Sequence, residues 1–348
     1  MGSTVVFTVP LDPDDDVDVS TRGTRGESAR EFSQQLRTAL VSRAWRGGLI
    51  AVLAASALGA VLAAVFAPRW TDFAPLLAAV AALTVSAAVV GAGVGVAAPR
   101  DLARRSDRLS IALARTAAII VAAVAMTAGA VPALAWLARA DAMREAQAVP
   151  VLVTMGGAAA VAALLGVAVG AWREWAKPLA AGGVAGLALV ALPLLGFAAA
   201  MPLTATNDQV EALQFVAINV VEANETRPAY ICATNTTTER RAHPERIAWL
   251  LSASPVVSVI DAPLYTPKDL AGATAGSAAS AQAALRTARL APSDVTGFCY
   301  QPTSLGVPNA VREARVSDPG VGAATGLALE FAAFGALALV ALSRRLRS

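Results

Sequence analysis

The stretch LAAGGVAGLALVALPLLGFAAAM, residues 179–201, is apolar throughout and is followed directly by the polar sequence PLTATNDQVEALQ, residues 202–214. A helix needs about 20 apolar residues to cross a bilayer, so the first stretch predicts a membrane-spanning helix. The polar sequence continues to about residue 320, where another apolar segment begins. The chain therefore inserts a polar domain, residues 202–320, between two membrane spans.

Apolar segments of similar length fill most of the chain before this insert. We expect six spans, at about 49–67, 73–98, 111–137, 149–171, 179–201 and 321–342. Charged residues make up only 15% of the 348 residues, whereas soluble domains have about 25%. The alternating pattern of an outer-membrane barrel is not seen. The sequence thus predicts an α-helical polytopic membrane protein, and its Ala, Arg and Val usage is typical of a GC-rich bacterial genome.

Lysine and arginine gather at four of the span boundaries. These are the N-terminal side, the loop 100–108, the turn 173–177 and the C-terminus, whereas the loops 68–72 and 139–147 have little basic excess. Short cytoplasmic loops carry the positive excess in membrane proteins. We therefore predict a multi-pass protein of the cell membrane with both termini cytoplasmic and residues 202–320 extracytoplasmic. The formal net charge of +3 is explained by these boundaries and does not indicate nucleic-acid binding.

The two ends of the chain are polar. Residues 1–26 include an acidic run and predict a disordered cytoplasmic tail. In residues 27–48 apolar side chains recur at helical spacing between arginines, which is typical of an amphipathic juxtamembrane helix. Residues 49–201 then hold the first five spans. Residues 343–348 follow the sixth span as a basic cytoplasmic tail.

The insert alternates between helical and strand-like patterns. We expect helices at about 207–223 and 244–253 and an Ala-rich helix that reaches about 290, and strands at 229–234, 256–260 and 295–300. The order from the first of these strands onward, strand–helix–strand–helix–strand, favours a small parallel α/β layer.

The only two cysteines, Cys232 and Cys299, fall on the first and third of these expected strands. Outside the cytoplasm such a pair is expected to be oxidised. Because the Cα atoms of bridged cysteines lie about 4.4–6.8 Å apart, we predict that the two strands are neighbours. The expected domain is therefore closed by a disulfide and has the strand order 2-1-3.

Few residues suggest a chemical site. Glu330 lies inside the sixth span, where a carboxylate is a functional hypothesis, although it can also be a hydrogen-bonded group facing the bundle or a partner subunit. Asp261 ends an expected strand, the place where α/β sheets bind ligands, and His243 precedes a proline as a helix cap or surface residue. Arg240 and Arg241 belong to a mixed-charge cluster that is either a solvated face or a docking patch for a partner.

Glycines four residues apart recur in the spans, at positions 91 and 95, 166 and 170, and 182 and 186. This spacing allows helices to approach closely. It fits packing within the bundle, and it also fits an interface with another protein.

The composition limits the classes of function. A structural zinc site needs about four Cys and His ligands, and the chain has two cysteines and one histidine, so we expect no metal and no cofactor. We expect a non-enzymatic integral membrane protein whose extracytoplasmic domain binds a ligand or protein partner, as a subunit of a cell-envelope complex or an oligomer. The alternatives are a transporter or channel component that uses Glu330, and an envelope enzyme acting on lipid or cell-wall precursors through Asp261 or His243.

Overall fold

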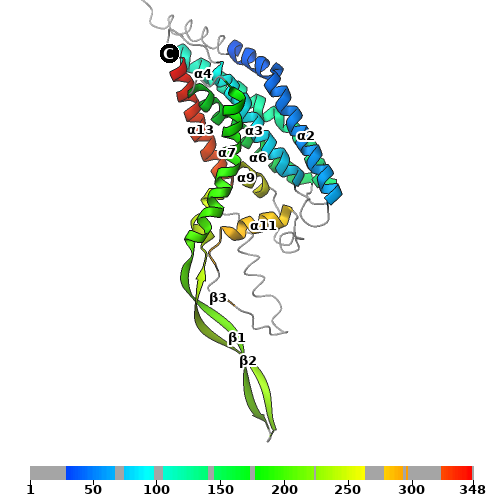
Figure 1. Cartoon of the computed structure of the whole chain (residues 1–348), viewed down its shortest axis with the longest axis vertical. Coiled ribbons are helices and arrows are strands. Elements are labelled where there is room, and N and C mark those ends of the chain that lie inside the picture. The colour runs from blue at the N-terminus through cyan, green and yellow to red at the C-terminus, as the bar shows by residue number, and fades with distance from the viewer. Residues whose placement is uncertain are drawn as a thin grey trace, which may run out of the picture.

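The computed structural model describes residues 29–66, 74–97, 105–139, 145–172, 177–222, 225–262, 278–292, 295–296 and 323–346. Six helices within these ranges are long and apolar enough to cross a membrane, which confirms the predicted spans. They form a bundle from which a long β-hairpin projects (Figure 1). The predicted tail 1–26 lies outside the described residues.

The six spans run in sequence order through the bundle. They are α2 (Arg43–Phe66), α3 (Ala74–Val96), α4 (Arg105–Ala125) continued by η1 (Met126–Ala130) and α5 (Val131–Arg139), α6 (Glu145–Trp172), α7 (Pro178–Ala200) and α13 (Ala323–Arg345). A separate helix over residues 29–41 precedes α2. This helix and the end of α13 lie at one end of the bundle, and the hairpin leaves from the other (Figure 1).

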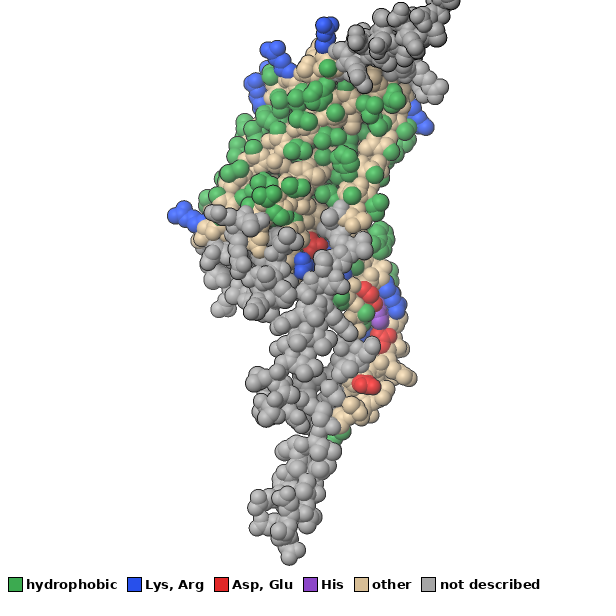
Figure 2. Space-filling view, turned by 180° about the vertical axis from the view of Figure 1, so that it is seen from behind, with side chains coloured by type: hydrophobic (Ala, Val, Ile, Leu, Met, Phe, Trp, Pro, Cys, Tyr) green, Lys and Arg blue, Asp and Glu red, His purple; other side chains and the backbone are tan. Residues whose placement is uncertain are grey.

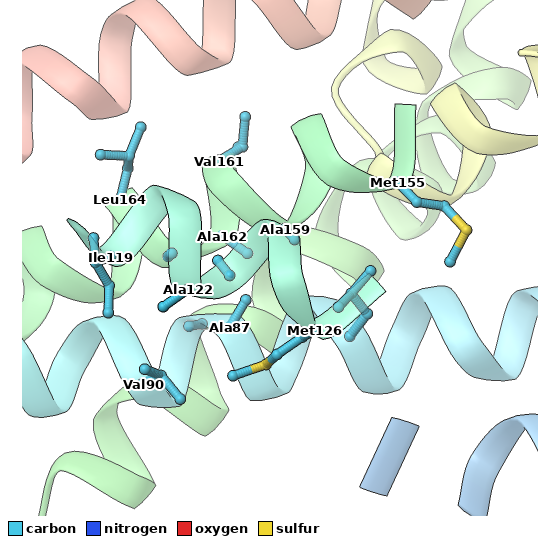
Figure 3. Packing of buried hydrophobic residues seen from close by; sticks show 14 of the residues in the cluster. Ala87, Val90, Ile119, Ala122, Met126, Met155, Ala159, Val161, Ala162 and Leu164 are labelled. Atoms are coloured by element: carbon cyan, nitrogen blue, oxygen red, sulfur yellow. The ribbon is translucent and has the colours of Figure 1, made fainter. Parts of the chain in front are cut away.

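The centre of the bundle is built from α3, α4 and α6. Their facing side chains are small or medium-sized, among them Ala87, Ile119 and Val161, and they pack without solvent exposure (Figure 3). The outward faces of the surrounding helices expose large apolar side chains such as Ile50 and Leu187. Figure 2 shows such side chains along the length of the bundle. This arrangement is expected where the solvent is lipid.

The paired glycines lie at contacts within the bundle. A Cβ atom added at Gly91 would meet the carbonyl oxygen of Ala163 in α6, and one added at Gly166 would meet that of Ala88 in α3. The glycines of α7, at 182 and 186, face the backbone of α3 in the same way. Of the two interpretations of this spacing, packing within the bundle accounts for all three pairs.

Span three changes to a 3-10 turn at η1, just before Pro132. The interruption is bridged by side chains of α2. Ser56 donates its hydroxyl to the carbonyl oxygen of Gly129 at 3.2 Å, and the indole nitrogen of Trp45 donates to that of Ala122 at 2.8 Å. Within a bilayer, backbone carbonyls need such partners because water is absent.

Two arginines hold the end of the bundle that carries residues 29–41. Arg345 donates to the carbonyl oxygens of Val96 (2.6 Å) and Gly170 (3.2 Å), and so joins the C-terminal ends of α3 and α6. Arg115, which is buried in α4, donates to the carboxylate of Glu31 at 3.2 Å. The helix over residues 29–41 is therefore attached to the bundle and is not only a surface element.

The hairpin consists of β1 (Thr206–Glu222) and β2 (Glu225–Arg241), which pair antiparallel along their whole length. A short strand, β3 (Val295–Thr296), pairs parallel with β1 at Glu211 and Ala212. The rest of the described insert is helical: η2 (Met201–Thr204), η3 (Pro244–Arg246), α8 (Trp249–Ser252), α9 (Pro255–Asp261) and α11 (Ala278–Ala288).

The expected helix over 207–223 is wrong, because these residues form β1. The apolar spacing that suggested a helix coexists with many β-branched residues, and pairing with β2 decides between the two forms. The expected strand at 256–260 is also wrong, because it lies in α9. Pro255 opens that helix after Ser254, and the short apolar run packs against the bundle, a case in which periodicity does not separate helix from strand.

The predicted strand order is wrong as well. The observed order is β2-β1-β3, so β1 lies between β2, which carries Cys232, and β3. The first and third expected strands are therefore not neighbours in the described sheet. Cys299 lies outside the described residues. The short helices after Pro244 and the helix α11, which ends near residue 290, confirm the helical predictions for those regions in part.

Candidate functional site

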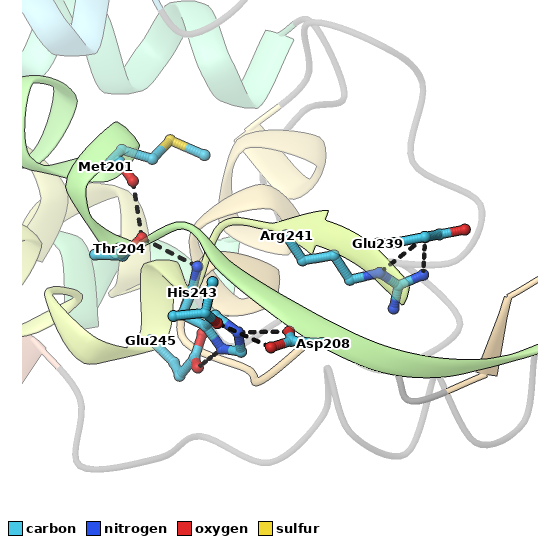
Figure 4. Close-up of polar contacts among 8 residues, drawn as sticks. Met201, Thr204, Asp208, Glu239, Arg241, His243 and Glu245 are labelled. Carbon is cyan, nitrogen blue, oxygen red and sulfur yellow. Dashed lines mark hydrogen bonds and ion pairs between the residues drawn. The ribbon is translucent and has the colours of Figure 1, made fainter. Parts of the chain in front are cut away.

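A cluster of polar side chains closes the root of the hairpin, where β1 begins and β2 ends. We define the hairpin-root cluster as Thr204, Asp208, His243 and Glu245. Thr204 and Asp208 come from the chain entering β1, and His243 and Glu245 from the chain leaving β2 (Figure 4). Because β1 and β2 are antiparallel, the start of β1 lies beside the end of β2, although these residues are far apart in sequence.

His243 lies at the centre of this cluster. Its Nε2 is 2.6 Å from Oδ2 of Asp208, and its Nδ1 is 2.8 Å from Oε1 of Glu245 (Figure 4). Its backbone N–H donates to the Thr204 hydroxyl at 3.0 Å. Both ring nitrogens can donate only in the protonated imidazole. The cluster therefore favours a positively charged ring between two carboxylates.

The pKa values of the cluster are shifted in the directions that this geometry demands. The hydrogen bond to Glu245, followed by that to Asp208, raises the pKa of His243, while partial burial and the charge of Arg246 oppose the rise. The hydrogen bond from Thr206 lowers the pKa of Asp208, and His243 lowers it further. The prediction that His243 caps a helix is correct for its backbone position before Pro244, but its side chain makes no cap bond.

Asp261 lies in a second cluster, at the C-terminal end of α9. Its carboxylate is buried and sits 2.6 Å from Nη1 of Arg289 and 3.6 Å from Nε of Arg286. Gln282 of α11 donates to its carbonyl oxygen at 3.0 Å. We define the Asp261 cluster as these four residues. The sequence prediction picked out Asp261 but placed it at the end of a strand, which is wrong.

The remaining predicted residues are dispersed. Arg240 is exposed on β2, and Arg241 pairs with Glu239 of the same strand at 2.8 Å. Glu330 lies on α13, three residues after Leu327. The Leu327 side chain lies beside Gly157 of α6. The Oε2 atom of Glu330 is buried and has no hydrogen-bond partner in the part of the chain that the structure describes.

These positions bear on the chemistry that the chain can perform. Both ring nitrogens of His243 are occupied by carboxylates, and Asp261 is occupied by two arginines, so neither group is placed to take a proton from a substrate. Within the described ranges no group of His, Cys, Asp and Glu side chains is arranged to hold a metal ion. No described feature favours the envelope-enzyme alternative.

The partners of His243 and of Asp261 were not predicted from the sequence. Asp208 stands 35 residues from His243, and Arg289 stands 28 residues from Asp261. Comparisons with protein families, with curated proteins and with solved structures find no match.

Proposed function

We propose that this chain is a multi-pass membrane protein that presents the β1–β2 hairpin outside the cytoplasm to bind a protein partner. The observation that carries the proposal is the length of the hairpin. Each strand has 17 residues, and at about 3.4 Å per residue a strand reaches roughly 55 Å. The hairpin extends away from the bundle along most of this length (Figure 1).

An isolated two-stranded hairpin is only marginally stable in water. β3 pairs with β1 at two positions, and no other described strand lies beside β2. Strand edges of this kind bind extended segments of other proteins through backbone hydrogen bonds. The sequence of residues 213–221, LQFVAINVV, also lacks polar alternation, which is typical of strands covered on both faces.

Site-specific photo-crosslinking in cells tests this function. A photo-reactive amino acid in place of Val216 or Thr236, both exposed on the hairpin, should give a discrete adduct with one protein. The same amino acid in place of Leu187, which is exposed on the lipid-facing side of α7, should give none. Absence of a defined adduct from both hairpin positions would contradict the proposal.

A shortened hairpin separates binding from folding. Ala212 and Asn235 are register partners, so an Asn-Gly turn in place of residues 213–234 closes the hairpin and keeps its root. We expect this variant to insert and to unfold at the same temperature as the full chain, because the bundle core lies elsewhere. The partner adduct should be lost from position 236.

A disulfide between Cys232 and Cys299 is part of the same proposal for an outer location. Neighbouring strands lie about 4.8 Å apart, so partners across a middle strand are separated by about 10 Å, too far for a bridge. The bridge therefore requires the chain after Thr296 to leave the edge of β1. Alkylation before and after reduction, followed by mass measurement, should add two labels only after reduction.

A second candidate function is a transporter or channel component acting through Glu330. The buried, unpartnered Oε2 atom of this carboxylate in the described bundle favours it. In proteoliposomes, Glu330→Gln should then abolish a proton or cation flux that Thr325→Ala, at an exposed site on the same helix, preserves. Liposomes that show no flux with the unmodified chain would remove this candidate.

A further inference from the structure

The face that α11 turns inward is polar. Its buried positions Ala279, Gln282 and Arg286 recur at helical spacing, and Arg289 follows three residues later. A helix that packs on another normally presents an apolar stripe. Here the stripe brings two guanidinium groups and an amide to the C-terminal end of α9.

The ion pairs of this cluster converge on one carboxylate. Asp261 supplies one carboxylate to two arginines, and both of its oxygens are engaged. Its carbonyl oxygen, near the negative end of the α9 dipole, is already occupied by Gln282. The Asp261, Arg286 and Arg289 side chains are 8%, 9% and 14% exposed, so this group of ion pairs is shielded from solvent.

Arg289 has one edge free. Its Nη1 is held by Asp261, whereas Nε and Nη2 are buried and have no hydrogen-bond partner among the described residues. Nε and Nη2 point the same way in the guanidinium plane and form the fork that grips a phosphate or carboxylate with two parallel bonds. Burying such a fork unpaired is unfavourable, and an anion relieves that cost.

The position of the cluster brings it near the ends of the spans. α8 lies at the hairpin end of the spans, since Leu250 is beside Gly196 of α7 and Ser252 beside Gly326 of α13. Trp249 of α8 is 67% exposed there, as aromatic residues are at a membrane surface. α9 follows directly and packs on the bundle. In a bilayer crossed by these spans, headgroup phosphates would lie near this end of the bundle.

We infer that the Asp261 cluster is a binding site for a phosphate group, with Arg289 as the bidentate ligand and Asp261 as the residue that holds Arg289 in place. The phosphate comes from a lipid headgroup of the outer leaflet or from a soluble phosphate. Because the fork is shielded, a small movement of α11 or of the Arg289 side chain admits the anion.

The test uses the full chain purified in a nonionic detergent, with thermal unfolding followed at constant ionic strength. One arm titrates inorganic phosphate, and the other titrates a short-chain phosphatidylglycerol. The variants are Arg289→Gln, Arg289→Lys and, as a matched control, the exposed Arg240→Gln. Arg289→Lys keeps the charge beside Asp261 and removes the fork, so it remains informative even when the glutamine variant does not fold.

Saturable stabilisation of the unmodified chain and of Arg240→Gln is the expected result, with roughly a tenfold or greater loss of affinity in Arg289→Lys, the size of one charged hydrogen bond. A response to phosphatidylglycerol alone assigns the site to a lipid headgroup, and a response to inorganic phosphate assigns it to a soluble anion. No stabilisation in either arm, or equal affinity in Arg289→Lys, overturns the inference. These readouts are independent of any protein partner at the hairpin.

Discussion

His243 is the only histidine of the chain, and at the hairpin root it connects the start of β1 to the chain that follows β2. Its protonated ring donates to Asp208 on the β1 side and to Glu245 on the β2 side. Deprotonation removes one of the two donors, because a neutral ring keeps a single N–H. The root of the hairpin is therefore expected to loosen as pH rises, without change in the bundle.

The sign of this pH dependence follows from the shifts. Folding raises the pKa of His243 above 6.5, chiefly through Glu245, so its contribution is complete below pH 6.5 and is lost as pH rises through the folded pKa. Folding lowers the pKa of Asp208 below 3.8, chiefly through Thr206, so its contribution is present above pH 3.8 and is lost as pH falls through the folded pKa. The hairpin root should therefore be most stable between pH 3.8 and pH 6.5.

A nuclear magnetic resonance titration of the imidazole checks this directly, since one histidine gives one signal. We expect a pKa above 6.5 in the full chain and a return toward 6.5 in Glu245→Gln, which removes the leading cause of the shift. The exposed Arg240→Gln serves as the control and should leave the titration unchanged. A pKa at or below 6.5 in the unmodified chain would contradict the observed hydrogen bonding.

Arg115 and Glu31 provide a second prediction at the scale of residues. The Arg115 side chain is 8% exposed, and Glu31 is the described residue to which its guanidinium donates. Removing one member of a fully buried pair costs about 3–5 kcal/mol because the other charge is left behind, and since Glu31 is 23% exposed we expect a cost of about 3 kcal/mol or less. Glu31→Ala should therefore lower the thermal unfolding temperature and expose residues 29–41 to protease. Arg37→Gln, at an exposed position of the same helix, should do neither.

The helix contacts give a prediction that distinguishes two glycines of one element. Gly91 and Gly93 both lie in α3, but an added Cβ meets the α6 backbone at the first and nothing within 4 Å at the second. Overpacking costs about 1–3 kcal/mol, whereas Ala is favoured over Gly in a helix by about 1 kcal/mol. Gly91→Ala should destabilise the bundle in detergent, and Gly93→Ala should leave it unchanged or more stable. Equal effects would show that α3 and α6 do not pack closely.

The elements differ in how far the sequence determines them. The spans were predictable because bilayer thickness requires long apolar runs, a signal that does not depend on neighbours. The insert was not, because the same apolar residues of 207–223 suit a helix face or a strand, and the choice depends on pairing with β2. The β-branched run in α9 favours a strand for a similar reason, because its burial among helices is a tertiary feature that the run itself does not encode.

The two candidate sites also depend on tertiary contacts that the sequence does not reveal. His243, as the only histidine, and Asp261, as a carboxylate next to a β-branched run, were recognisable from the sequence. Their partners were not, since Asp208 reaches His243 only when the hairpin closes, and Arg289 reaches Asp261 only when α11 packs on α9. The Ser254-Pro255 pair is a local helix-start signal and favours the helical form of α9 over a strand.

The whole molecule has a polarity that can be measured. Residues 29–41 and the end of α13 share one end of the bundle, exposed Arg30, Arg37 and Arg344 lie on these elements, and the hairpin occupies the opposite end (Figure 1). Since cytoplasmic boundaries carry the basic excess, we expect the hairpin to be extracytoplasmic.

Alkaline phosphatase inserted between Glu222 and Glu225, at the hairpin turn, should be active, because it folds only outside the cytoplasm. A fluorescent protein fused after the last residue should be bright, because it matures inside. An inactive phosphatase together with a dark fluorescent protein would show the opposite membrane orientation. The proposed partner and phosphate sites would then face the cytoplasm.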